Sequence, residues 1–201
     1  MINTTEARIL DSAHNLFFQY GIKSVTMDDI AGHLGMSKKT IYSFFDDKDK
    51  LVCALTGKEF ENQQSDLIKI AGHTQNAVEE MMGIIKYLSV MFSKMNRYLI
   101  YDLQKYHPNA WKLFSNFKED CIVKVMQRNI KRGIKEELYR PAVNPRIMAL
   151  LRMKEAEWTL DTEVFPPKEF TLGEVHVQLL EHFLYGIVSL KGYKLIDKYK
   201  N

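Results

Sequence analysis

Apolar side chains recur every three or four residues along most of this chain, which is the spacing of one face of an α-helix. The pattern predicts an all-α protein with about nine helices and no strands. Proline and glycine separate the periodic stretches, because proline lacks an N–H group and glycine tolerates a positive φ. The expected helices cover residues 5–20, 27–34, 38–45, 47–70, 75–93, 97–106, 108–138, 145–160 and 172–197.

Two short helices follow each other closely between residues 26 and 45. Thr26 is suited to cap the first helix, and Asp29 completes a T-x-x-D box that satisfies N–H groups at the helix start. Gly35 follows the last turn, where the chain needs a positive φ. Ser37 can then cap the second helix, so the stretch predicts two helices joined by a four-residue turn.

The second short helix has two distinct faces. Its inward side chains are Ile41, Phe44 and Phe45. On the opposite side, at about 100° per residue, lie Lys39, Tyr42 and Ser43. The small Ala31 in the first helix allows a close crossing, so the series matches a helix-turn-helix, whose second helix can enter the major groove of DNA.

Several motifs around this pair occur together at one spacing. In chain order they are Ala13, Leu16 and Phe17, then Gly21, the stretch from Val25 to Ala31, Thr40-Ile41-Tyr42, Phe45, and the stretch from Asp47 to Leu51. Over residues 8–51 the chain resembles the DNA-binding domain of the TetR family of bacterial transcriptional regulators. The resemblance implies residues 1–50 as a domain that binds operator DNA as a homodimer. It implies residues 51–201 as a helical domain for effector binding and dimerisation.

The groove-facing side chains are the candidates for DNA contacts. We expect Lys38, Lys39 and Tyr42 to reach base edges, since lysine donates to guanine and a tyrosine ring packs on thymine, and Ser43 lies on the same side. The family resemblance implies phosphate contacts from Thr26, Ser37, Thr40, Tyr42 and Lys48. Helix capping is the alternative role of Thr26 and Ser37. An ordinary exposed lysine is the alternative for Lys48.

Charge does not by itself indicate DNA binding. The net charge of the 201 residues is +3, yet residues 1–50 hold six Lys or Arg against seven Asp or Glu. The inference therefore rests on where the lysines stand. A basic stripe follows one face of the seventh expected helix, namely Lys124, Arg128, Lys131, Arg132 and Lys135. It is either a solvated face or a second anion-binding surface.

The remaining composition is that of an ordinary globular protein. Hydrophobic residues make up 46% and charged residues 26% of the chain. Cys53 and Cys121 are not spaced as metal ligands are, so we expect them to be buried free thiols in a reducing compartment. The N-terminal residues carry no apolar segment typical of a signal peptide, and no stretch is long enough to span a bilayer. We expect a cytoplasmic protein without a membrane partner.

No constellation of catalytic residues stands out in the second half. The six histidines show no metal-binding spacing, so we expect no metal, no cofactor and no enzymatic activity. Methionine and aromatic residues are dense between residues 81 and 117. At helical spacing each of them is more often plain core, but as a group they also fit an apolar pocket for a small organic effector. The candidate lining residues are Met91, Phe92, Tyr98, Trp111 and Phe114.

The last expected helix is apolar on more than one face, which predicts a second buried side. We expect it to pair with the helix before it, and this pair to pack against the same two helices of a partner chain as a two-fold four-helix bundle. The candidate interface residues are Leu151, Trp158, Leu180, Phe183, Leu184 and Ile187.

Together these features predict a ligand-responsive transcriptional regulator, a repressor that a small hydrophobic effector releases from a palindromic operator. One alternative is a helix-turn-helix protein that binds DNA constitutively, or serves as an adaptor, with no effector. An enzyme built on a helical bundle is the other alternative, and it would require titratable residues converging on a pocket.

Overall fold

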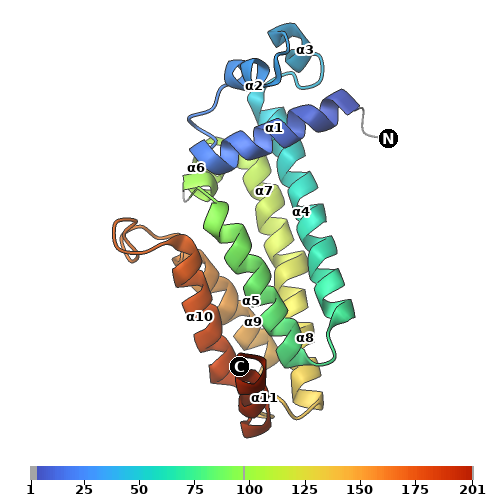
Figure 1. Ribbon diagram of the computed structural model, residues 1–201, viewed down its shortest axis with the longest axis vertical. Helices are drawn as coiled ribbons and strands as arrows, with labels where there is room; N and C mark the ends of the chain where they lie inside the picture. Colours follow the sequence, from blue (N-terminus) through green and yellow to red (C-terminus); the bar gives the residue numbers. More distant parts are fainter. Residues whose placement is uncertain (1–3, 97, 201) are drawn as a thin grey trace. The chain divides into compact units, whose positions relative to one another are not determined.

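The computed structural model describes residues 4–96 and 98–200, and its regular elements are helices, as Figure 1 shows. Its helices are α1 (Thr4–Tyr20), α2 (Met27–Leu34), α3 (Lys38–Tyr42), α4 (Lys48–His73), α5 (Ala77–Lys94), α6 (Tyr98–Tyr106), α7 (Pro108–Phe117), the π-helix η1 (Lys118–Val123), α8 (Lys124–Lys135), α9 (Pro145–Trp158), α10 (Leu172–Ile187) and α11 (Leu190–Lys200). The predicted all-α class is confirmed. Within the described residues, no helix is both long and apolar enough to cross a membrane.

The helices group into two compact units. The first unit comprises residues 1–62 and 94–116, and the second comprises residues 63–93 and 117–201. The first unit is larger than the segment 1–50 expected from the sequence, because it includes the first half of α4 together with α6 and α7. The boundary between the units therefore falls inside α4.

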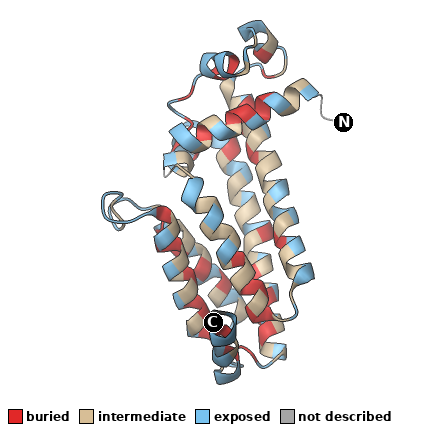
Figure 2. Ribbon diagram, viewed as in Figure 1, coloured by how far each residue is buried: buried red, intermediate tan, exposed pale blue. Residues whose placement is uncertain are grey.

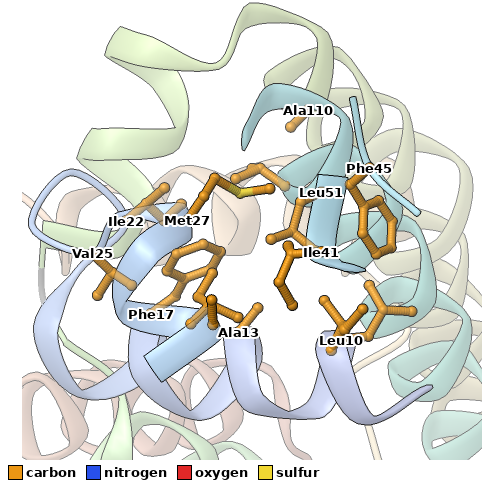
Figure 3. Close-up of a cluster of buried hydrophobic side chains, with 14 of the residues drawn as sticks. Leu10, Ala13, Phe17, Ile22, Val25, Met27, Ile41, Phe45, Leu51 and Ala110 are labelled. Carbon is orange, nitrogen blue, oxygen red and sulfur yellow. The ribbon is translucent and has the colours of Figure 1, made fainter. Parts of the chain in front are cut away.

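The first unit has one apolar core, drawn in Figure 3. Phe17 of α1, Ile30 of α2, Ile41 of α3 and Leu51 of α4 are each at most 1% exposed. Ala110 of α7 belongs to the same cluster, which explains why α7 joins this unit. Burying these side chains holds α2 and α3 on a fixed support, since each buried aliphatic or aromatic side chain contributes roughly 1.5–3 kcal/mol.

The second unit has its own core, formed chiefly by α5, α8 and α10. Met81, Ile130 and Leu180 are buried there, and Figure 2 shows the buried positions along these helices. Tyr139 is the largest polar side chain in this core, and its hydroxyl lies 2.9 Å from the carbonyl oxygen of Ala77. Tyr139 packs directly against Gly133, where a methyl group would lie 2.2 Å from the ring.

Two helices expected as continuous are interrupted. The predicted helix 108–138 contains the six-residue π-helix η1, and regular helix ends at Lys135. The prediction of one helix over residues 172–197 is wrong, because the chain is extended at Val188 and a new helix begins at Leu190. Here the backbone pairs with another segment, since Ser189 N–H donates to the carbonyl of Leu138 at 2.9 Å.

Smaller shifts occur at other helix ends. Helix α3 ends at Tyr42 instead of Phe45, and α4 continues to His73, so Gly72 does not end it. The predicted start of the sixth helix, Arg97, lies outside the described residues. Helix-end shifts of this size follow from local hydrogen bonds and leave the order of helices unchanged.

The basic stripe on α8 is partly neutralised within the second unit. Arg128 and Arg132 both bind the carboxylate of Glu80, at 3.0 and 3.2 Å, and Glu80 is 1% exposed. Arg132 also binds Glu136 at 2.7 Å. These two arginines therefore stabilise a buried acid, whereas the lysines of the stripe are exposed.

Candidate nucleic-acid interface

Helix α2 begins with a complete capping box. The Thr26 hydroxyl accepts from the N–H of Asp29 at 3.1 Å, and the Asp29 carboxylate accepts from the N–H of Thr26 at 2.7 Å. The hydrogen bonds from Thr26 lower the pKa of Asp29. The predicted cap is thus confirmed, and it fixes where α2 starts.

The turn between α2 and α3 depends on Gly35. Its φ of 62° lies in the left-handed region, as the sequence predicted, and its N–H donates to the carbonyl of Gly32 at 3.1 Å. The N–H of Met36 donates to the carbonyl of Ala31 at 2.9 Å and closes the turn. This end motif satisfies the last carbonyl groups of α2 and directs the chain into α3.

Helix α3 is short and capped at both ends by side chains. Ser37 accepts from the N–H of Thr40 at 3.1 Å, which confirms its capping role. The hydroxyl groups of Ser37 and Thr40 lie 2.8 Å apart. Ser43, expected on the groove-facing side, is exposed and donates to the carbonyl of Thr40 at 2.7 Å. Its hydroxyl is therefore engaged in closing the helix.

Three side chains proposed to reach bases lie on the exposed surface of α3. Lys39 is exposed, and Tyr42 is 45% exposed despite its size. Lys38 is also exposed, but its ammonium binds the carboxylate of Asp28 on α2. This hydrogen bond raises the pKa of Lys38 and offsets its charge. Lys39 and Tyr42 are therefore the side chains of this group best placed to approach a groove.

Lys48 has a structural contact that the sequence did not reveal. Its side chain is half-buried, and its ammonium donates to the backbone carbonyl of Ile22 while lying 5.8 Å from the Phe17 ring centroid. Burial lowers the pKa of this ammonium. Because lysine has three donors, two remain for a phosphate oxygen. A phosphate contact from Lys48 stays a prediction.

The support beneath the helix-turn-helix includes α6 and α7, which sequence reasoning did not connect with it. Asp102 of α6 is 5% exposed and accepts from the N–H of Lys23 at 2.8 Å. Asp49 of α4 lies 2.9 Å from the His107 ring and accepts from Asn109 at 3.1 Å. A helix-periodicity argument cannot find such pairs, because their partners stand more than 50 residues apart.

The residues expected to line an effector pocket fall into both units. Trp111 and Phe114 belong to the first unit, with ring centroids 5.1 Å apart, and they pack against its core. Tyr98, in the same unit, is 56% exposed. Met91 and Phe92 belong to the second unit, where Phe92 lies 4.3 Å from the His176 ring. The five residues therefore do not form one cluster within either unit.

The expected dimer residues divide by exposure. Leu151 and Trp158 of α9 are 40% and 55% exposed, so both offer area to a partner chain. The four residues expected from the last helix are buried in the core of their own unit, at 4% exposure or less: Leu180, Phe183, Leu184 and Ile187. These four side chains therefore stabilise the core of their own unit, and a role for them in a dimer stays a prediction.

Comparison with known proteins bears on this arrangement. Residues 9–55 match the family model described as bacterial regulatory proteins, tetR family. The chain is 27% identical over 188 residues to an uncharacterized HTH-type transcriptional regulator, YvaF, of Bacillus subtilis (strain 168), with 92% of this chain and 96% of that protein covered.

Solved structures show the same fold. A TetR-family transcriptional regulator from Agrobacterium tumefaciens has a TM-score of 0.76 at 15% identity, covering 91% of this chain and 97% of that one. A regulator from Saccharomonospora viridis in complex with choline has a TM-score of 0.75 at 17% identity, covering 92% of this chain and 100% of that one. The helix-turn-helix and the helices after it thus form one recurrent architecture.

Proposed function

Since this chain belongs to the tetR family of bacterial regulatory proteins and is a DNA-binding transcriptional regulator, we propose that it is a homodimeric repressor released from its operator by a small apolar molecule. The proposed binding of operator DNA is supported chiefly by the exposure of Lys39 and Tyr42 on α3. Both side chains extend from a helix whose start, turn and core are fixed. Such a rigid support suits side chains that read base edges.

The proposed dimer uses the outer face of α9. Ile147, Leu150, Leu151 and Trp158 are all at least 40% exposed and recur at helical spacing along one side. An exposed apolar stripe of this kind favours association with another copy of the chain, because association removes it from water. A two-fold dimer would carry two α3 helices to successive major grooves, roughly 34 Å apart.

The effector part of the proposal draws on the second unit. The regulator from Saccharomonospora viridis was solved in complex with choline, so a protein of this fold can hold a small organic molecule. In this chain the second unit contains half-buried methionine and aromatic side chains on α5, including Met82 and Phe92. Such side chains adapt to the shape of an apolar ligand.

Release requires that the effector bind more tightly to the form that does not bind DNA. A coupling of about 1–3 kcal/mol would weaken operator binding roughly 5- to 150-fold. Helix α4 contributes residues to both units, so we propose that it links effector binding to the spacing of the two α3 helices.

The experiment has two stages. Selection from random duplexes should enrich a pseudo-palindrome, and operator binding is then measured across a panel of apolar compounds alongside thermal unfolding. We expect at least one compound that both stabilises the protein and releases DNA. Compounds that stabilise the protein without releasing DNA would instead support a constitutive DNA-binding protein. Enrichment of no sequence would contradict the proposal as a whole.

A further inference from the structure

A recess opens on the surface of the second unit between α5, α10 and α11. Its volume is about 270 Å³, including the part that is open to solvent. Sites for drug-sized ligands usually measure about 300–1,000 Å³, so this recess suits a smaller molecule. All three helices contribute to its lining, which consists of Met82, Ile85, Glu181, Leu184, Tyr185 and Ile196.

The most deeply buried part of the lining is apolar. Leu184 is 2% exposed and Ile196 is 0% exposed, and both belong to the core of the second unit. Met82 and Ile85 of α5 are half-buried and pack against the same core. The recess is therefore a depression in a packed core, and a hydrocarbon group that enters it is removed from water.

The polar groups of the recess both come from α10. Glu181 and Tyr185 are half-buried and stand four residues apart, so their side chains are neighbours on one side of this helix. The Tyr185 ring packs against Tyr193 of α11, with ring centroids 5.6 Å apart. This contact limits the movement of the Tyr185 ring at the recess.

The charge of the lining favours a cation. Glu181 is the one acidic residue among the six, and none of the six is basic. A carboxylate forms strong hydrogen bonds with an ammonium group, and the face of a tyrosine ring also attracts a cation. Glu181 makes another interaction as well, but a carboxylate has about four acceptor positions and can accept from more than one donor.

We propose that this recess binds a small primary amine in its ammonium form that carries a short hydrocarbon group. The hydrocarbon packs on Leu184 and Ile196, while the ammonium donates to the Glu181 carboxylate beside the Tyr185 ring. Because the polar side chains are only half-buried, the ammonium keeps part of its hydration, which avoids the large cost of burying an ion completely. This class of ligand lies outside the proposed function, so the test measures binding and not release of DNA.

The test uses three probes that share one hydrocarbon group: 3-methylbutylammonium, 3-methylbutan-1-ol and 3-methylbutanoate. Each is titrated into the full-length protein at pH 7 and constant ionic strength, and methyl NMR signals of Met82 and Ile196 report the recess. We expect the ammonium to bind roughly 5- to 10-fold more tightly than the alcohol, because hydrogen bonds between charged groups are about twice as strong as neutral ones. The butanoate should bind least.

Three results of this titration would overturn the proposal. The first is an affinity for the alcohol equal to that for the ammonium, and the second is tighter binding of the butanoate. The third is an ammonium titration that leaves the methyl signals of Met82 and Ile196 unmoved.

The variant Glu181→Gln tests the role assigned to the carboxylate. It keeps the size of the side chain and removes its charge, so the ammonium should lose its advantage while the affinity for the alcohol stays unchanged. The matched control is Glu174→Gln, which removes the charge of an exposed residue on the same helix and should keep the advantage. An ammonium preference that survives in Glu181→Gln would overturn the assignment.

A second variant tests the location without changing any charge. Ile85→Trp places a larger side chain in the recess and should abolish binding of the ammonium and the alcohol alike. Its control is Val90→Trp, at a position of α5 that is 54% exposed, which should bind both as the parent does. Unchanged binding by a folded Ile85→Trp protein would overturn the site, and if that variant does not fold, Glu181→Gln decides.

Discussion

The contact between Gly133 and Tyr139 gives a sharp test of how the second unit is packed. Replacing Gly133 by alanine would place a methyl group 2.2 Å from the ring, whereas ordinary contacts begin at 3.4 Å. The ring would have to retreat by about 1.2 Å, the difference between those two distances. Tyr139 cannot retreat easily, because it is 1% exposed and its hydroxyl is held at the carbonyl of Ala77.

The opposing effects can be compared in size. Alanine is favoured over glycine inside a helix by about 1 kcal/mol. Overpacking typically destabilises by about 1–3 kcal/mol, and losing the Tyr139 hydrogen bond adds about 1 kcal/mol. We therefore expect Gly133→Ala to lower the free energy of unfolding by about 1–3 kcal/mol. For a chain of this length, the melting temperature should fall by about 2–12 °C.

The matched control is Gly57→Ala in α4, where an added methyl group meets no atom within 4 Å. This variant should gain only the higher helix propensity of alanine, so its melting temperature should be about 2–4 °C above that of the parent. Both are measured by thermal unfolding monitored by circular dichroism. A Gly133→Ala protein as stable as the parent would refute the tight packing of Tyr139 against α8.

Three other predictions concern the interface, the dimer and pH. Lys48→Met should remove the hydrogen bond to Ile22, lower the free energy of unfolding by about 1–3 kcal/mol, and reduce the salt dependence of DNA binding by about one phosphate contact; an unchanged salt slope would show that Lys48 is structural only. Leu151→Glu and Trp158→Glu should yield monomers by sedimentation, whereas Ile68→Glu, at an exposed apolar position on α4, should not; a dimeric mass for all three would exclude the α9 face. Because burial lowers the pKa of His176 to about 3, the unfolded chain takes up the proton first as pH falls below its ordinary 6.5. Stability conferred by the neutral imidazole is thus complete above that pH and should decline between pH 7 and 5 by up to about 1.4 kcal/mol per unit. His176→Phe should flatten this decline in urea unfolding, and parallel profiles would refute the assignment.

Local features of the helix-turn-helix could be predicted from the sequence, since they depend on neighbours along the chain. The Thr26–Asp29 box, the left-handed Gly35 and the Ser37 cap each involve residues within a few positions of one another. The buried Ile41 follows from helical periodicity in the same way. These features indicated both the fold and the exposed face of α3.

Features that depend on distant partners could not be predicted in the same way. Periodicity indicated an apolar last helix, but not that Leu180, Phe183, Leu184 and Ile187 would lie in the core of their own unit. The break at Val188 depends on pairing of Ser189 with Leu138, although Ser189 could have been read as a cap of the following helix. The pairing of α9 and α10 was expected, but no sequence pattern revealed that the Arg152 and His176 side chains would meet between them.

Operator discrimination by Lys39→Ala, measured against Lys135→Ala, tests most directly the claim that α3 reads DNA sequence. Both variants lose one exposed positive charge, but only Lys39 stands on α3. We expect Lys39→Ala to lose about 1–3 kcal/mol of discrimination at one position per half-site. Lys135→Ala should distinguish the selected operator from random duplex as well as the parent does. Equal discrimination by both variants and the parent would contradict the placement of α3 in the major groove.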